Sequence, residues 1–227
     1  MNMEINKYIE HTLLKADATE EQFRQLCDEA REYNFLAVCV NPGWISYCKK
    51  QLEGSTVKIC TVIGFPLGAT LTQAKALEAN EAVKEGADEL DMVINIGYLK
   101  SGKYQEVVDD IVAVVKAAGD LPVKVIIETC LLSESEKVLA CKAVLEAKAA
   151  FVKTSTGFST AGATVEDVIL MKSIVKDSAG IKAAGGVSNV LDLYAMVENG
   201  ANRIGTSRGV TLMKALDGET VTTGNEY

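Results

Sequence analysis

The sequence contains one histidine, His11, and its six cysteines include no CxxC pair. Zinc and iron sites that need several imidazoles are therefore excluded, although a magnesium ion held by carboxylates is not. A disulfide framework is not expected, because a chain of 227 residues with 48% hydrophobic residues can bury a full core without one. We interpret His11 as a structural residue of the first strand and expect the thiols to be reduced.

The sequence also lacks long hydrophobic runs and an excess of positive charge. No apolar run approaches the roughly 18 residues of a membrane span, and residues 1–15 lack the basic and apolar stretches of a secretory signal. The formal net charge of -8 disfavours binding to nucleic acid or to an anionic membrane surface. We therefore expect a cytoplasmic protein that binds neither and whose partner is a small molecule.

Helical periodicity alternates with short runs of β-forming residues along the chain. Helices are predicted over 19–33, 44–52, 71–85, 104–118, 133–147, 164–175, 190–199 and 208–216. Strands are predicted over 8–13, 35–40, 57–62, 89–94, 123–127, 150–154, 181–184 and 203–205. Eight such units indicate the α/β class and a single-domain (β/α)8 TIM barrel over residues 1–216, followed by a flexible polar tail, 217–227. An open, doubly wound sheet is the alternative, but its usual glycine-rich turn is absent after the first predicted strand.

Three charged residues, Asp91, Lys153 and Lys182, lie inside predicted strands, where burial is costly. If the apolar faces of the strands pack on the helices, these side chains converge inside the mouth of the barrel. Desolvation and a neighbouring ammonium group both lower the pKa of a lysine, so one lysine can be a neutral amine near pH 7. A neutral lysine attacks carbonyl groups and a carboxylate can move protons, which would make the cluster catalytic. The alternative is an interior ion-pair network with a structural role.

Glycine-rich segments follow the last three predicted strands, at 154–158, 184–188 and 205–209. Loops of this kind, with free backbone N–H groups beside a helix N-terminus, often bind phosphate in barrels. Each segment by itself is equally typical of a simple chain reversal. The three in barrel order favour a phosphate site, to which Arg208 adds a cation.

The sequence resembles the deoxyribose-phosphate aldolases in residues 90–97, 151–158 and 181–187, and also in 9–15, 38–42 and 62–68. The resemblance implies a class I aldolase, a lyase that needs neither a metal nor another cofactor. Such an enzyme reversibly cleaves 2-deoxy-D-ribose 5-phosphate to acetaldehyde and D-glyceraldehyde 3-phosphate through a lysine Schiff base. The resemblance also implies a role in deoxyribonucleotide breakdown and is compatible with a homodimer.

Residue roles follow from the same resemblance. Lys153 matches the Schiff-base lysine, Lys182 the second lysine that lowers its pKa, and Asp91 the carboxylate that relays protons through water. Positions that match the substrate and phosphate contacts are Cys39, Thr156, Gly157, Gly185, Gly186, Gly205 and Ser207. The chain departs from the family pattern at Glu10, Ala16, Cys130 and Arg208.

The tail ends in Tyr227, as members of the family commonly do. Its lack of periodicity predicts mobility without a function. The alternative is that the Tyr227 phenol folds over the barrel mouth and helps to transfer a proton. Two other functions also stay open for the whole chain: a lysine-dependent aldolase or transaldolase acting on another sugar phosphate, and a barrel that binds a phosphosugar without catalysis.

Overall fold

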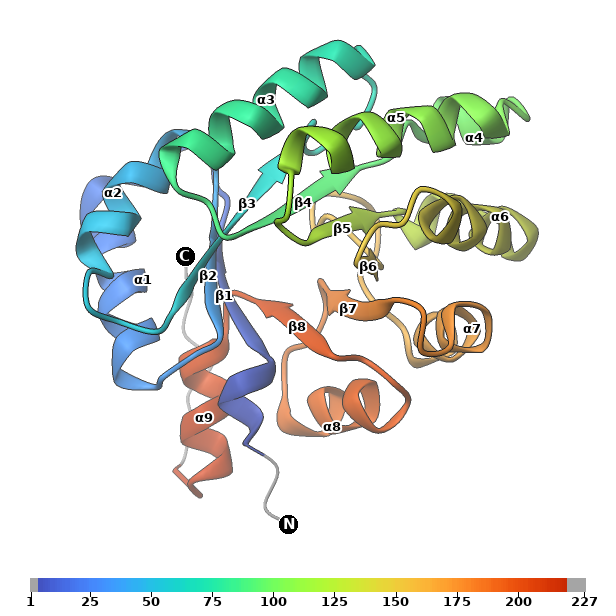
Figure 1. The fold of residues 1–227 in the computed structure, drawn as a ribbon. Coiled ribbons are helices and arrows are strands. Elements are labelled where there is room, and N and C mark those ends of the chain that lie inside the picture. The colour runs from blue at the N-terminus through green and yellow to red at the C-terminus, as the bar shows by residue number, and fades with distance from the viewer. Residues whose placement is uncertain (1–3, 220–227) are drawn as a thin grey trace.

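The computed structural model describes residues 4–219, which form a closed barrel of parallel strands surrounded by helices (Figure 1). The strands are β1 (Ile9–Leu13), β2 (Ala37–Val40), β3 (Lys58–Ile63), β4 (Glu89–Val93), β5 (Val123–Ile126), β6 (Phe151–Lys153), β7 (Gly180–Ala184) and β8 (Arg203–Thr206). The helices are α1 (Glu20–Glu32), α2 (Ile45–Gln51), α3 (Thr72–Glu85), α4 (Ile96–Lys100), α5 (Tyr104–Ala118), α6 (Glu134–Glu146), α7 (Val165–Val175), α8 (Val190–Glu198) and α9 (Gly209–Leu216). Short 3-10 helices are η1 (Ile5–Tyr8), η2 (Pro42–Trp44) and η3 (Thr129–Leu131).

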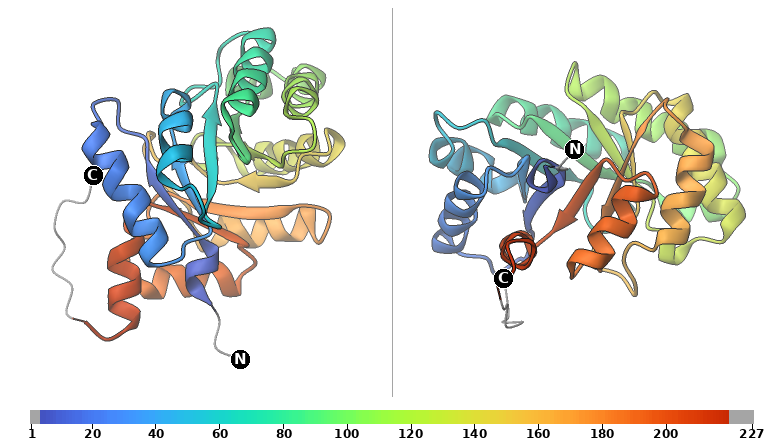
Figure 2. Two further views of the ribbon diagram at one scale, coloured as in Figure 1. Left: turned by 60° about the vertical axis from the view of Figure 1, so that its left-hand side comes forward. Right: turned by 90° about the horizontal axis from the view of Figure 1, so that it is seen from below.

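Each strand pairs in parallel with the next one along the chain, and β8 pairs with β1 to close the ring. In that closing pair Glu10 stands opposite Gly205. The two further views in Figure 2 show that the helices lie outside the ring of strands. The last helix, α9, contacts the first element of the chain, η1. The predicted (β/α)8 barrel is therefore confirmed.

The helix ends follow the local signals in the sequence. Ser133 caps α6 in a reciprocal capping box with Glu136, and Thr19 does the same for α1 with Gln22. The eight predicted helices are present, with ends that coincide with the predicted ones or differ by one residue. The sequence analysis missed α4, because its five residues continue the apolar run of β4 and are too few to show a helical period.

The barrel separates two environments. Alternate strand residues such as Leu90 and Met92 are fully buried in the main apolar core, which helices such as α5 also enter through Val107 and Ile111. The other residues of β4, Glu89 and Asp91, are equally buried but polar. Alternation along a strand places them on the opposite face, toward the barrel interior.

Within residues 4–219, none of the helices combines the length and the hydropathy of a membrane span. The division between a barrel ending at residue 216 and a flexible tail stays a prediction, because residues 220–227 lie outside the described part of the chain.

Gly68 provides a test of how tightly the loop after β3 packs on β4. Its φ is 67°, and a Cβ atom there would lie 1.9 Å from the carbonyl oxygen of Ile94. We expect Gly68→Ala to lower the free energy of unfolding by more than about 3 kcal/mol, because a backbone atom blocks the methyl group. Gly102→Ala is the matched control, since Gly102 has a φ of 71° with open space around it and should cost only about 1–2 kcal/mol. Urea unfolding measures both variants, and equal losses would contradict the packing argument.

Candidate active site

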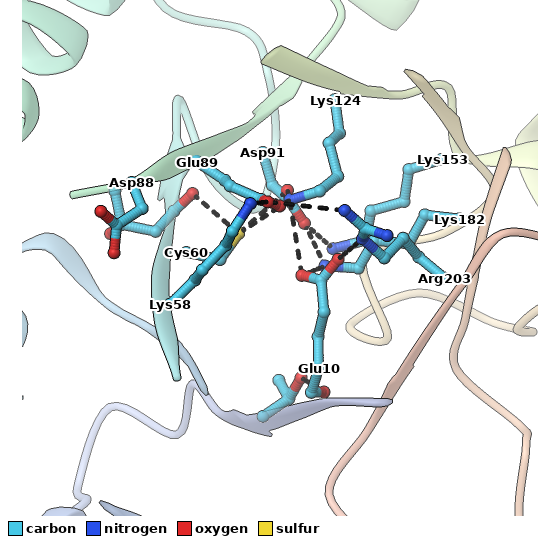
Figure 3. A network of polar contacts seen from close by, with 12 residues as sticks. Glu10, Lys58, Cys60, Asp88, Glu89, Asp91, Lys124, Lys153, Lys182 and Arg203 are labelled. Atoms are coloured by element: carbon cyan, nitrogen blue, oxygen red, sulfur yellow. Dashed lines mark hydrogen bonds and ion pairs between the residues drawn. The ribbon is translucent and has the colours of Figure 1, made fainter. Parts of the chain in front are cut away.

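Six charged side chains from five strands meet inside the barrel (Figure 3). All are at most 3% exposed, and we call them the charge network: Glu10 from β1, Glu89 and Asp91 from β4, Lys124 from β5, Lys153 from β6 and Lys182 from β7. Three carboxyl groups thus face three lysine amino groups. The structure brings the predicted Asp91, Lys153 and Lys182 together, and it adds three residues that the sequence analysis did not assign to the cluster.

Asp91 is the centre of the network. Its Oδ2 accepts hydrogen bonds from Lys153 Nζ and Lys182 Nζ, each at 2.7 Å, and its Oδ1 accepts one from Lys124 Nζ at 2.9 Å. Burial raises the pKa of this carboxyl group, but the attraction of the three ammonium groups outweighs burial and holds the pKa well below its usual range. Asp91 is therefore a carboxylate that stays ionised.

Lys124 and Lys182 are held as cations by several carboxylates. Besides its bond to Asp91, Lys124 Nζ lies 2.7 Å from Glu89 and 3.4 Å from Glu10. Lys182 bonds both Glu10 and Asp91. Burial lowers the pKa of both lysines, but these carboxylates raise each pKa above its ordinary value by a larger amount. The neutral lysine expected from the sequence is therefore neither of these two.

The amino ends of the strands carry further cations. Lys58 Nζ lies 3.1 Å from Glu89, and the Arg203 guanidinium lies 3.6 Å from both Glu89 and Glu10. Burial raises the pKa of Glu89, but the attraction of Lys124, Arg203 and Lys58 lowers it overall. Lys58 is 46% exposed and Arg203 20%, so the network ends here at solvent.

Two thiols lie beside Asp91. The sulfur atoms of Cys39 and Cys60 and a carboxylate oxygen of Asp91 lie within 4.8 Å of one another, all buried. A metal ion does not fit this group, because both oxygens of Asp91 already bond to ammonium groups that would repel a cation. Cys39 belongs to a small cluster with Leu14 and Cys60 rather than to the pocket described next.

A pocket of about 470 Å³ opens where β1, β6, β7 and β8 end. It contains every glycine predicted to bind phosphate, together with Thr156 and Ser207; its lining also includes Thr12, Leu14, Lys15, Lys153, Phe158, Ser188 and Arg208. Of the six residues in the charge network, Lys153 is the one that lines it. The pocket is thus connected to the buried charges through Lys153.

Gly205 connects the pocket to the network in a second way. A Cβ atom at this position would lie 3.0 Å from Cε of Lys182 and 3.0 Å from Cβ of Ala184. A side chain on Gly205 would therefore require Lys182 or Ala184 to shift by a few tenths of an ångström, in addition to any effect on the pocket.

Sequence analysis missed Glu10, Glu89 and Lys124 as members of the site. Alternation in β4 places Glu89 on the same face as Asp91, which is the signal that could have found it. Glu10 was noted only as a departure from the family pattern. Lys124 carried the same signal as Lys182, a lysine inside a strand. His11, interpreted as structural, is buried and bonds Glu29 at 2.7 Å. Tyr227 lies outside the described residues.

Comparison with known proteins identifies one family and close relatives. Residues 6–216 match the DeoC/LacD family aldolases. A protein from Streptococcus equi subsp. zooepidemicus named deoxyribose-phosphate aldolase is 60% identical over 212 residues, which are 93% of this chain and 96% of the relative. The aldolase QR15 is 39% identical with a TM-score of 0.91, covering 95% of this chain and 97% of its own. A tetrameric deoxyribose phosphate aldolase from Aeropyrum pernix is 34% identical with a TM-score of 0.87, covering 94% and 91%.

Lys124→Met tests whether the network is held by charge balance. At about pH 7 we expect the free energy of unfolding to fall by about 3–5 kcal/mol, because Asp91 and Glu89 lose a buried counter-charge. Lys124 has a raised pKa, so in the wild type its contribution is present at every pH below about 10.4. The variant's carboxyl groups should take up protons at a higher pH than in the wild type, so its deficit should shrink as the pH falls toward about 4.

Chemical unfolding across this pH range provides the measurement. Lys84→Met is the control, because Lys84 pairs with Glu81 at the surface, 61% exposed, and should cost at most about 1 kcal/mol. A Lys124→Met deficit that does not change with pH would mean that lost packing, not charge, causes the loss.

Proposed function

Since its sequence matches over residues 6–216, the chain belongs to the DeoC/LacD family of aldolases, and we propose that it cleaves 2-deoxy-D-ribose 5-phosphate. The products are acetaldehyde and D-glyceraldehyde 3-phosphate, and the reaction is reversible. As an aldolase the chain is a lyase. The name of its Streptococcus relative and the three glycine-containing loops around the pocket support this substrate.

The observation that carries the proposal is the position of Lys153. This lysine lines the pocket. Among residues 4–219 its one carboxylate partner is Asp91, whereas Lys182 bonds two carboxylates and Lys124 contacts three. Each additional carboxylate stabilises the ammonium form of a lysine. Lys153 is therefore the lysine that we assign as the nucleophile.

The reaction follows from amine chemistry. The neutral Nζ of Lys153 adds to the aldehyde carbon C1 of the open-chain sugar, and loss of water gives a protonated imine. Removal of the proton from the C3 hydroxyl breaks the C2–C3 bond, and the bond's electron pair moves into the imine to form an enamine. Glyceraldehyde 3-phosphate leaves, C2 takes up a proton, and hydrolysis of the imine releases acetaldehyde and restores Lys153. The imine accepts the electrons, so no step requires a metal ion.

Asp91 and Lys182 maintain the conditions for these steps. The low pKa of Asp91 makes it a poor store for a proton, so we assign it to orienting Lys153 and to passing protons through a water molecule. The ammonium group of Lys182 shares Oδ2 of Asp91 with Lys153. Its positive charge therefore lies beside the proposed nucleophile, across one shared carboxylate oxygen.

The remaining features fit a phosphate at the outer end of the pocket. The N-terminal end of α9 follows Ser207 and Arg208, and both residues line the pocket. Such a helix end with a neighbouring cation attracts an anion. Self-association as a homodimer stays a prediction for this chain, and light scattering on the purified protein would measure it.

Borohydride trapping tests the nucleophile. With acetaldehyde and borohydride the wild type should gain the mass of one ethyl group at Lys153, located by peptide mass spectrometry. Lys153→Arg should lose both trapping and cleavage while remaining folded, because arginine stays charged at working pH. Lys116→Arg, on the exposed face of α5, is the control and should behave as the wild type.

Two results would overturn this assignment. If pure Lys153→Arg still cleaved the sugar phosphate, Lys153 could not be the residue that forms the Schiff base. Binding of the sugar phosphate by a wild type that neither traps nor cleaves would indicate a phosphosugar-binding barrel without catalysis. Faster cleavage of a different sugar phosphate would keep the mechanism and change the substrate.

Arg208→Ala tests the phosphate end of the pocket. Arg208 is half-buried, so we expect the KM for the phosphorylated sugar to rise about fivefold, equivalent to about 1 kcal/mol, with kcat retained. The KM for unphosphorylated 2-deoxyribose should stay the same. Lys214→Ala removes a charge from the other end of α9 and serves as the control. An equal rise for both sugars in Arg208→Ala would place the phosphate elsewhere.

A further inference from the structure

Glu128 is a buried carboxylate outside the charge network. It directly precedes η3, is 2% exposed, and has a left-handed backbone with φ 55° and ψ 66°. The other non-glycine residues of positive φ among residues 4–219 are Asn34, Lys148 and Lys176, and all three are exposed. A strained backbone at a buried acidic residue is costly and therefore points to a specific role.

The carboxylate of Glu128 is committed to one residue, Thr156. Its Oε1 accepts from the Thr156 backbone N–H at 3.1 Å, and its Oε2 accepts from the Thr156 hydroxyl at 2.5 Å. Within residues 4–219 no lysine, arginine or histidine lies within 4.0 Å of it. These two donors therefore provide the hydrogen bonding that replaces water around this buried charge.

The backbone on both sides of Glu128 is fixed against β6. The N–H of Ile127 donates to Lys153 O and the N–H of Thr129 donates to Thr154 O, each at 3.0 Å. Glu128 is thus held beside the peptide that joins the proposed nucleophile to the loop after it. A shift of the β6 loop would break the Glu128 contacts while leaving β6 paired.

The same contacts determine which donors of the loop already have an acceptor. Thr156 gives both of its donors to Glu128, and the N–H of Phe158 donates to the Thr156 hydroxyl oxygen at 3.0 Å. Gly157 lies between Thr156 and Phe158 and lines the pocket. Its backbone N–H has no acceptor among residues 4–219. Thr156, expected from the sequence to contact the substrate, therefore has no free donor for it.

We infer that Glu128 is a positioning residue for phosphate recognition, which acts through Thr156 and presents the N–H of Gly157 to the phosphate. The inference rests on the proposed function in one respect, that the pocket takes a phosphorylated sugar. Glu128 does not touch the substrate in this role. Its removal should therefore weaken phosphate binding and spare the chemistry at Lys153.

Glu128→Gln is the principal test, because glutamine keeps the shape and replaces one acceptor oxygen with a donor. We expect the KM for 2-deoxyribose 5-phosphate to rise about tenfold, or about 1.4 kcal/mol, with kcat and the KM for unphosphorylated 2-deoxyribose unchanged. The affinity for inorganic phosphate, measured by calorimetry, should fall by a similar factor. Glu78→Gln is the control, since Glu78 bonds the backbone N–H of Gly64 in the loop after β3, away from the pocket, and should change neither quantity.

A double variant, Glu128→Gln with Thr156→Val, separates positioning from general stability. If Glu128 acts through Thr156, the double variant should raise the KM for the phosphorylated sugar no more than the stronger single variant does. Equal increases in KM for both sugars, or additive effects, would overturn the inference. If Glu128→Gln does not fold, Thr156→Val alone tests the inference. Its KM should then rise for 2-deoxyribose 5-phosphate and stay the same for unphosphorylated 2-deoxyribose, and an equal rise for both sugars would overturn the inference.

The failure of this inference is distinguishable from the failure of the proposed function. If the wild type cleaves the phosphorylated sugar and Glu128→Gln keeps both its KM and its phosphate affinity, the positioning role is wrong. If the wild type does not cleave this sugar but its phosphate affinity falls in Glu128→Gln, the substrate is wrong and the positioning role stands.

Discussion

The need to balance charge inside a closed barrel governs the rest of this structure. Three carboxyl groups and three lysine amino groups are buried together, and Asp91 bonds all three lysines. Isolated charges in such a place would be neutralised by a change of protonation, so the lysines hold Asp91 as a carboxylate and the carboxylates hold Lys124 and Lys182 as cations. The lack of a side chain at Gly205 follows from the same need, because Lys182 occupies that space.

The charge balance is uneven, and this unevenness gives the three lysines different chemistry. Lys124 has carboxylates on several sides, Lys182 has two, and Lys153 has one. The lysine with the fewest partners also lies at the pocket, where a substrate can reach it. An ion-pair network is therefore compatible with the proposed nucleophile, since the network surrounds Lys153 with fewer carboxylates than its neighbours.

The strand and helix order of the barrel could be predicted from periodicity, and so could the convergence of Asp91, Lys153 and Lys182, because lysine and aspartate interrupt otherwise apolar strands. Lys124 could have been assigned by the same argument, since it interrupts a strand and pairs directly with Asp91 of the preceding strand. Glu10 was harder to assign, because its contacts join strands that are far apart in the sequence, and Glu10 meets Lys182 only because β8 closes onto β1. The hydrogen bonds of Thr156 were also beyond prediction, since no local pattern reveals that Glu128 accepts from both of its donors.

The sequence separations within the charge network have a consequence for the newly made chain. Asp91 is 62 residues from Lys153 and 91 from Lys182, and Glu10 is 172 residues from Lys182. On the ribosome, β1 to β5 therefore emerge with Glu10, Glu89 and Asp91 but with Lys124 as their single interior ammonium group. Those carboxylates need water until β6 and β7 arrive, so the first five strands cannot close over a dry interior. The charge network is thus completed among the last parts of the fold, when the final strands bring Lys153 and Lys182.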